Sequence, residues 1–337
     1  MKSTNFAKYL TEFFTSYLSG QKNASKNTIL AYRDTFKLLL RYSQEVKGIP
    51  IERINMDTLS ARFITDFLNW LELERNCSVS TRNQRLASIH SFFRYVQCEE
   101  PSGIYHFQKV ISIPIKKNEK TLVEHLSPEA IKLILQQPHT GSAKGRRDLT
   151  LLSVLYDTGA RVQELIDIKI FDIFLDSPEV IALTGKGNKT RTVPLMKNTV
   201  ALLKSYLSEN TLNKPWKNKY PLFINNQHKK LTKEGVSYIL NKYVSMAKID
   251  STIIPERVSP HMFRHSKAMH LLQAGVNLIY IRDFLGHVDI KTTEIYARAD
   301  TEMKRKAIEN AYPDIIDSNI PDWSKDKELL LWLAEME

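Results

Sequence analysis

The chain has 337 residues, of which 42% are hydrophobic and 25% are charged, a composition typical of globular proteins. No apolar run approaches the roughly 20 residues of a membrane span, and residues 1–20 are amphipathic, unlike a signal peptide. We therefore expect a cytoplasmic protein with no membrane partner. The two cysteines, Cys77 and Cys98, form no Cys/His cluster, which indicates neither a disulfide framework nor a zinc site.

Charge narrows the class of partner. The 48 lysines and arginines exceed the 37 aspartates and glutamates, which gives a net charge of +11. A basic chain of this size favours a polyanionic partner, with nucleic acid first. Charge alone does not separate a nucleic-acid-binding protein from a merely soluble basic one.

The length of 337 residues favours a division into two domains.

Residues 1–111 are predicted to be helical throughout. Apolar side chains recur at helical spacing in four segments: 6–18, 29–40, 63–71 and 81–96. Pro50 interrupts the chain after the second of these. The fourth segment carries Arg82, Arg85 and Arg94 beside its apolar stripe. Such a helix suits a phosphate backbone, although a solvated basic face explains the same pattern.

A basic linker is predicted between two blocks of the chain. Pro101-Ser102-Gly103 ends the helical block, and residues 109–125 contain Pro114 and a lysine-rich run without helical periodicity. We therefore expect an extended interdomain linker at residues 112–125.

The second block is predicted to combine helices with one small hairpin. Ser127 followed by Pro128 is a strong helix-start signal. Helices are expected at residues 127–137, 147–156, 196–208, 232–247, 261–273 and 276–285. Short β-type runs at residues 180–184 and 190–195 flank Gly185-Lys186-Gly187, which predicts a hairpin with lysines at its tip.

Tyr296 is expected about two turns into a short helix. Gly286 can end the preceding helix and Asp289 can N-cap the next. A tyrosine hydroxyl, with a usual pKa near 10, is a poor nucleophile unless it is activated and an electrophile is held nearby. A lone tyrosine on such a helix is more often a core residue. Beyond it, helices are expected at residues 299–311 and 325–336, the last one strongly apolar.

Several charged residues of the second block lie beside helix ends or turns, where a core role is implausible. Arg161 follows a tight turn at Thr158-Gly159, and Lys186 lies between two glycines. His261 and Arg264 are three apart, so they project from one face of a helix. Each alone is more often a surface charge. Together with a second histidine and Tyr296 they suit a phosphodiester, because arginines neutralise charge, tyrosine attacks, and lysine or histidine moves protons. No carboxylate cluster of a two-metal nuclease accompanies them.

The order of these residues resembles the tyrosine recombinase (phage-type integrase) family. The matching positions are Arg161, Lys186, His261, Arg264, His287 and Tyr296. Their flanking sequences match as well, at residues 158–165, 259–265 and 285–287. Residues 27–32 and 80–86 resemble the helical core-binding domain of the family, so the resemblance covers nearly the whole chain. Asp289 stands where many members have serine.

The resemblance implies how the phosphate is held and attacked. Arg161 and Arg264 would clamp the scissile phosphate, and His287 would hydrogen-bond it. Tyr296 would attack it, which forms a 3′-phosphotyrosyl link and frees a 5′-hydroxyl. The 5′-hydroxyl of a partner strand would then reverse the attack, so that strands are exchanged through a Holliday junction.

The resemblance also implies the supporting roles. Lys186 would be the general acid for the leaving oxygen, and His261 the base or proton relay. Glu164 would orient Arg161, and His265 would be structural. Because the covalent link keeps the energy of the bond, neither ATP, nor a metal, nor another cofactor is implied.

The implied fold is mainly α with a small β-sheet. A helical SAM-like core-binding domain (residues 1–111) and a mixed α+β catalytic domain (residues 126–312) would form a C-shaped clamp round duplex DNA. The tail, residues 313–337, would dock on a neighbouring protomer. DNA contacts are expected at Lys26, Asn27, Arg82, Arg85, Arg94, Lys116 and Lys117.

The implied assembly is a homo-tetramer, a dimer of dimers, that pairs two DNA sites; the free protein would be a monomer, and accessory proteins could take part. A type IB topoisomerase uses similar chemistry, but it acts as a monomer without a partner site. A catalytically silent DNA-binding protein has no need of Tyr296 with all its partners. Among recombinases, Xer-like dimer resolution is an alternative to integration or excision of a mobile element. The insertion at residues 210–221 and the longer tail favour the mobile element.

Overall fold

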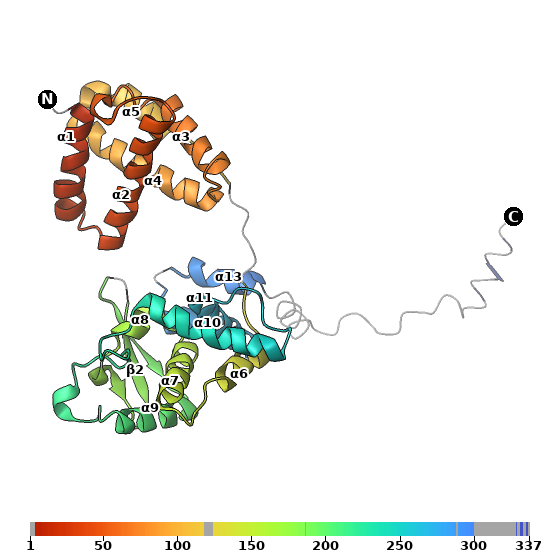
Figure 1. Cartoon of the computed structure of the whole chain (residues 1–337). Helices are drawn as coiled ribbons and strands as arrows, with labels where there is room; N and C mark the ends of the chain where they lie inside the picture. Colours follow the sequence, from red (N-terminus) through yellow and green to blue (C-terminus); the bar gives the residue numbers. More distant parts are fainter. Residues whose placement is uncertain are drawn as a thin grey trace. The chain divides into compact units, whose positions relative to one another are not determined.

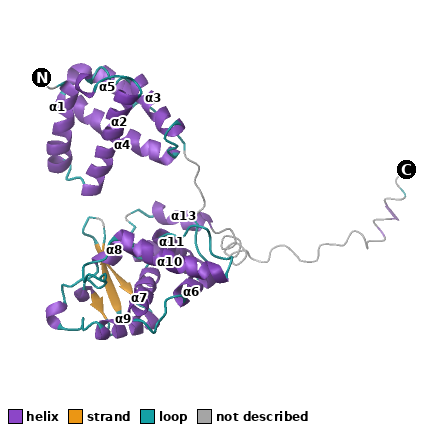
Figure 2. Cartoon of the chain, viewed as in Figure 1, coloured by secondary structure: helices purple, strands orange, loops and turns teal. Residues whose placement is uncertain are grey.

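The computed structural model describes residues 4–117, 124–185, 187–287 and 289–299, together with positions 328, 331, 332 and 335. The chain divides into two compact units, Met1–Thr121 and Leu122–Glu337 (Figure 1). The division falls inside the stretch predicted as the linker. Helices dominate, and the second unit contains a small sheet (Figure 2), so the predicted fold class is confirmed.

The first unit is a bundle of helices. Its elements are α1 (Asn5–Glu12), the π-helix η1 (Phe13–Gln21), α2 (Lys26–Glu45), η2 (Ile51–Arg53), α3 (Ala61–Leu73), α4 (Val79–Glu99), η3 (Pro101–Gly103) and α5 (Ile104–Ile111). Serine caps begin three of them, because the hydroxyls of Ser25, Ser60 and Ser78 each accept a hydrogen bond from a backbone amide of the first turn. The helical segments predicted at residues 29–40 and 81–96 lie within α2 and α4.

Aromatic rings fill the core of this unit around α4. Phe92 packs edge-on against Phe6, Phe13 and Phe36, with centroids 5.8, 5.4 and 5.1 Å away. Edge-to-face pairs at this separation stabilise a core beyond the area they bury. Helix α4 is covered on several sides, so that Arg82 and His90 are buried along with its apolar residues.

The stretch after η3 differs from the prediction. Residues 104–111 form α5, a helix that lies beyond the Pro101-Ser102-Gly103 break predicted to end the helical block, although it stays within the range 1–111 predicted as helical. The inward face of this short helix consists of only Phe107 and Val110, which is too little periodicity to recognise. The chain beyond it is fastened to α4, because Arg82 Nη1 donates to Pro114 O at 3.2 Å and Asn83 Nδ2 donates to Lys116 O at 2.8 Å.

The second unit packs helices around a three-stranded sheet. Its helices are α6 (Pro128–Gln136), α7 (Ala143–Thr158), α8 (Val162–Asp167), η4 (Ile170–Asp172), α9 (Lys197–Glu209), η5 (Pro215–Lys217), α10 (Lys233–Asp250), α11 (Pro260–Gln273), α12 (Leu278–Leu285) and α13 (Lys291–Ala299). The strands β1 (Ile173–Phe174), β2 (Val180–Thr184) and β3 (Thr190–Pro194) are antiparallel in the order β1-β2-β3. The predicted hairpin is confirmed as β2 and β3, whereas β1 was not predicted.

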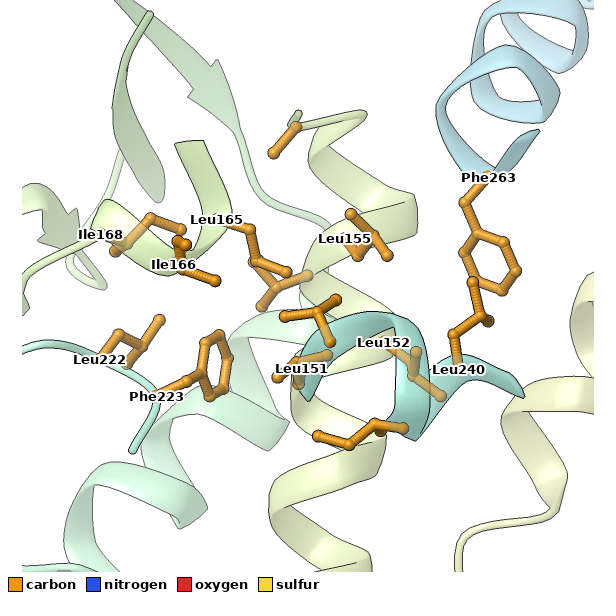
Figure 3. Close-up of a cluster of buried hydrophobic side chains, with 14 of the residues drawn as sticks. Leu151, Leu152, Leu155, Leu165, Ile166, Ile168, Leu222, Phe223, Leu240 and Phe263 are labelled. Carbon is orange, nitrogen blue, oxygen red and sulfur yellow. The ribbon is translucent and has the colours of Figure 1, made fainter. Parts of the chain in front are cut away.

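Helix α7 lies at the centre of the larger core. Its Leu151, Leu152 and Leu155 are fully buried and belong to the cluster in Figure 3, which also contains Leu165 of α8 and Phe263 of α11. Phe263 neighbours Arg264 in sequence. Burial of this apolar face therefore fixes the orientation of the helix that carries three predicted site residues.

A smaller core fastens α13. Tyr296 packs there with residues of α11 and α12, which are Ala268, Met269, Leu272, Ile281 and Leu285. The helix begins at Lys291. The amide of Thr292 donates to Asp289 O at 3.1 Å, and the amides of Thr293 and Glu294 both donate to Ile290 O, so the first backbone bonds of this helix reach back to residues 289 and 290. The predicted helices at 299–311 and 325–336 lie outside the described residues, apart from Ala299 and the four isolated positions.

Shortening Phe92 to alanine is expected to lower the free energy of unfolding by about 3–5 kcal/mol, because it removes a buried ring from the centre of the aromatic core. Leu73→Ala serves as the control, since Leu73 is 80% exposed and such surface changes stay within about 0.5 kcal/mol. Urea unfolding followed by circular dichroism measures both. Equal effects of the two substitutions would contradict the assignment of the core.

Candidate active site

A cleft of about 900 Å³ opens on the second unit where three segments meet. These are the start of α8, the β2–β3 hairpin, and the turn from α12 to α13. Its lining includes His287 and four cations, Arg161, Lys189, Arg191 and Arg282. Several cations thus face one cavity, which suits an anionic ligand.

Arg161 reaches the cleft because α7 ends abruptly. Gly159 has a left-handed backbone with φ of +56°, which lets the chain leave α7 and begin α8 at Val162, three residues later. Arg161 then occupies the position before α8, where its backbone N–H donates to Glu164 Oε2 at 2.9 Å and its Nη1 donates to Glu164 Oε1 at 2.7 Å. About a third of its side chain remains open to solvent, 36%.

Arg264 lies deeper, with its side chain 4% exposed. Its guanidinium joins two helix ends, because Nη1 donates to Gly159 O at 2.6 Å and Nη2 donates to Leu285 O at 2.5 Å. Burial and the nearby charge of Arg161 lower the pKa of Arg264 to about 9. The group therefore stays positively charged at neutral pH.

Glu164 is the buried anion among these cations. Beside its bonds to Arg161, it accepts a hydrogen bond from Arg191 Nη2 at 2.8 Å, and Arg264 Nη1 lies 3.9 Å away. Burial alone would raise the pKa of Glu164, but the bonds and charge of Arg191 and the bonds from Arg161 outweigh it and hold that pKa at about 2. Glu164 is therefore ionised at neutral pH.

Arg191 is a site residue that the sequence analysis missed. It lies on β3, two residues before the buried Val193, so strand alternation turns both toward the interior. A charged residue at an inward position of a strand was the available signal. Its partner on the neighbouring strand is Leu183, which gives no hint of a charge-binding site.

His287 lies at the break between α12 and α13. Gly286, with φ of +65°, ends α12 and allows this turn. The ring nitrogen Nδ1 of His287 is 2.9 Å from Thr293 Oγ1, a second residue that the sequence analysis did not assign. Burial and the charges of Arg264 and Arg161 lower the pKa of His287 to about 4, so the imidazole is neutral at neutral pH.

Tyr296 is buried, with 1% of its surface exposed. Its hydroxyl is 2.8 Å from His265 Nδ1, and its ring lies almost parallel to that of His287 with centroids 6.5 Å apart. Burial raises the pKa of Tyr296 above its usual value, although the charges of Arg264 and Arg161 act in the opposite direction. The hydroxyl is thus protonated and adjoins the cleft residues from within the core.

The remaining predicted residues differ in their placement. His261 is exposed in the first turn of α11, and desolvation with the charges of Arg264 and Arg161 lowers its pKa. His265 contacts the Tyr296 hydroxyl rather than only filling space. Lys186 lies outside the described residues. The structure therefore brings Arg161, Arg264, His287 and Tyr296 into one neighbourhood around Glu164.

Two of the predicted DNA contacts turn inward in the first unit. Arg82 has only 4% of its side chain exposed and donates to Pro114 O, so the prediction that it contacts DNA is wrong. Arg85 is half-buried, and its Nη1 donates to Ala31 O at 3.0 Å. Both arginines join segments of the fold instead. The exposed candidates are Lys26, Asn27, Arg94, Lys116 and Lys117, of which Lys116 pairs with Glu72.

No helix among the described residues is long and apolar enough to cross a membrane.

Comparison with known proteins agrees with this arrangement. Residues 124–303 match the Phage integrase family, and residues 11–100 match the phage integrase N-terminal SAM-like domain. The chain is 37% identical over 313 residues to a protein of Sinorhizobium fredii named as an integrase/recombinase, which covers 93% of each chain. It is 31% identical over 307 residues to the tyrosine recombinase XerD of Staphylococcus haemolyticus, covering 90% of this chain and 98% of the relative.

A solved structure is similar over most of the chain as well. It is the XerH site-specific recombinase bound to a palindromic difH substrate in a post-cleavage complex, with 25% identity and a TM-score of 0.66 over 86% of this chain and 80% of that one. The chain therefore belongs to the phage integrase family of tyrosine recombinases, enzymes that cleave and rejoin DNA.

Proposed function

We propose that the cleft binds the scissile phosphate of a DNA site and that Tyr296 attacks it. The observation that carries this proposal is the set of arginines gathered by Glu164 beside a tyrosine. Arg161 presents a partly open guanidinium, and Arg264 supplies a buried positive charge. Charges fixed before the reaction stabilise the pentavalent transition state without reorganisation.

Proton transfers accompany the attack. The proton of the Tyr296 hydroxyl must leave, and a 5′-oxygen must gain one. Neutral histidines can accept a proton, and the pKa values of His261 and His265 are both lowered by burial and by neighbouring positive charge. His261 is our candidate for the base or relay, and Lys186 for the general acid on the strength of its position in the sequence.

His287 is suited to donate a hydrogen bond to the phosphate. A neutral imidazole carries one ring proton, and a hydrogen bond at one nitrogen decides where that proton resides. When the Thr293 hydroxyl donates to Nδ1, the proton of His287 is on Nε2. The ring then offers a donor to an anion in the cleft while Thr293 holds its orientation.

Tyr296 has to leave its buried position before it can attack. Its hydroxyl bonds to His265, and its ring packs on α11 and α12. We infer that α13 shifts when DNA and neighbouring protomers assemble, which brings the hydroxyl to the phosphate held by Arg161. Strand exchange between two paired sites in a homo-tetramer then proceeds through a Holliday junction.

Integration or excision of a mobile element is the biological role that we propose. The relative from Sinorhizobium fredii, 37% identical over 93% of each chain, is named as an integrase/recombinase, which supports this role. Xer-like dimer resolution is the alternative, because XerD of Staphylococcus haemolyticus is 31% identical over 90% of the chain. Either role places the protein in the cytoplasm on duplex DNA, with the free protein a monomer.

Tyr296→Phe is expected to bind DNA and to form no covalent adduct, because it lacks the attacking oxygen. The assay is a nicked duplex that carries a site selected in vitro by the wild-type protein, analysed on a denaturing gel. Tyr238→Phe, which alters an exposed tyrosine of α10, should form the adduct normally. An adduct formed by the Tyr296 variant would show that another residue attacks.

Glu164→Gln is expected to remove a pH-dependent part of the stability. The pKa of Glu164 in the folded protein lies below its ordinary value, so its contribution is present above about pH 4.5 and is lost as the pH falls toward 2. The difference in unfolding free energy between wild type and variant should shrink by on the order of 3 kcal/mol across that window, since one pKa unit corresponds to about 1.4 kcal/mol. Urea titrations at a series of pH values from about 2 to about 6 measure this difference. A constant difference would mean that Glu164 does not pair with the arginines in solution.

Arg94 and Arg82 should behave differently although both lie on α4. Arg94→Ala is expected to reduce the slope of log affinity against log salt by about one, because it removes one phosphate contact. Arg82→Ala should keep that slope and lower stability by about 1–3 kcal/mol, because it removes a buried side chain and the hydrogen bond by which that side chain holds Pro114 O. Fluorescence anisotropy over a salt series and thermal unfolding separate the two effects. The reverse result would restore Arg82 as a DNA contact and exclude Arg94.

A further inference from the structure

Arg191 occupies the junction of three segments that form the cleft. It extends from β3, and only 12% of its side chain is exposed. Its Nη2 donates to Glu164 Oε2 on α8 at 2.8 Å, and its Nε donates to Phe284 O near the end of α12 at 2.8 Å. One guanidinium therefore ties the hairpin both to the residue that holds Arg161 and to the helix that leads to His287.

The fit between Arg191 and the turn before His287 is close. A Cβ atom at Gly286 would lie 2.9 Å from both Cδ and Nη1 of Arg191, which is nearer than real contacts allow. The side chain thus lies directly on the backbone of Gly286. Glycine is needed there both for this approach and for its left-handed backbone.

The donors of Arg191 are mostly committed within the protein. Nε and Nη2 are bonded to Phe284 and Glu164, and Nη1 lies against Gly286. This distinguishes Arg191 from Arg161, whose side chain is 36% exposed and whose guanidinium bonds to Glu164. A side chain held in this way orients its neighbours more readily than it binds a phosphate.

We propose that Arg191 is a positioning residue, which locks the β2–β3 hairpin onto α8 and the α12–α13 turn so that Arg161 and His287 meet the same phosphate. The proposal rests on the function proposed above for those two residues. The hairpin tip carries Lys186 in sequence, so the same lock anchors the base of the hairpin that bears the candidate general acid. Catalysis is sensitive to such alignment, since a displacement of about 1 Å costs on the order of 10²-fold in rate.

Substitution of Arg191 tests the proposal in the full chain. Arg191→Met should bind the selected site like wild type but form the covalent adduct on a nicked substrate about 10²-fold more slowly. Arg191→Lys keeps the charge but cannot form both bonds at once, so its rate should fall between the two. Arg146→Met is the matched control, because Arg146 also pairs with a glutamate, Glu209, on the same unit but does not line the cleft. Wild-type adduct rates for Arg191→Met would overturn the proposal.

A double-mutant cycle with Glu164→Gln separates positioning from direct contact with DNA. If Arg191 acts through Glu164, adding Arg191→Met to Glu164→Gln should slow the reaction less than it slows the wild type. Additive losses would mean that Arg191 acts independently of Glu164, for example on the phosphate itself, and the proposed role would be wrong.

A measurement on free protein distinguishes failure of this proposal from failure of the proposed function. In NMR spectra without DNA, Arg191→Met should shift the amide signal of Gly286 and the ring signals of His287, whereas Arg146→Met should leave them unchanged. Unchanged signals in the Arg191 variant would overturn the lock whether or not the protein cleaves. If the signals shift in the Arg191 variant but the wild-type protein itself forms no adduct, the positioning role of Arg191 would stand and the proposed catalytic function would be wrong.

Discussion

The site depends on one buried carboxylate. Glu164 accepts bonds from Arg161 and Arg191, and Arg264 lies within 4 Å of it. An unpaired carboxylate in this position would be strongly destabilising, and guanidinium groups gathered without it would repel one another. The Glu164 carboxylate and the guanidinium groups around it therefore offset each other's cost of burial. Three arginines surround this one carboxylate, and the lining of the cleft adds Lys189 and Arg282 as well as Asp283 and Asp289, so an excess of positive charge remains for a phosphate.

The C-terminal ends of two helices also hold the site together. Helices α7 and α12 both stop at glycines with left-handed backbones, Gly159 and Gly286. The last carbonyls of a helix lack partners within it, and Arg264 satisfies one at each end by donating to Gly159 O and Leu285 O. The ends of these two helices thus also provide the carbonyls that hold Arg264 in place. Loss of Arg264 would leave both buried carbonyls without a donor.

Local patterns in the sequence predicted the local features of the fold, namely helix starts, strands and the faces of helices. The Ser127-Pro128 signal gave the start of α6, short β-type runs gave β2 and β3, and spacing placed His261 and Arg264 on one face of a helix. Arg191 was missed because its partners lie on α8 and α12, far away in sequence. Arg82 was misassigned because periodicity identifies the faces of a helix but not which of them neighbouring segments cover. The burial of Tyr296 likewise depends on how α13 packs, which no local pattern specifies.

The buried position of Tyr296 has a consequence for the population of reactive molecules. Exposing the ring would forfeit burial that stabilises by about 2 kcal/mol, and breaking the bond to His265 would forfeit about 1 kcal/mol more. Fewer than about one molecule in a hundred would then present its hydroxyl at any moment. An isolated molecule on DNA would accordingly nick it rarely, however tightly the cleft holds the phosphate. A partner that binds only the open form would raise the rate by mass action, without touching the chemistry.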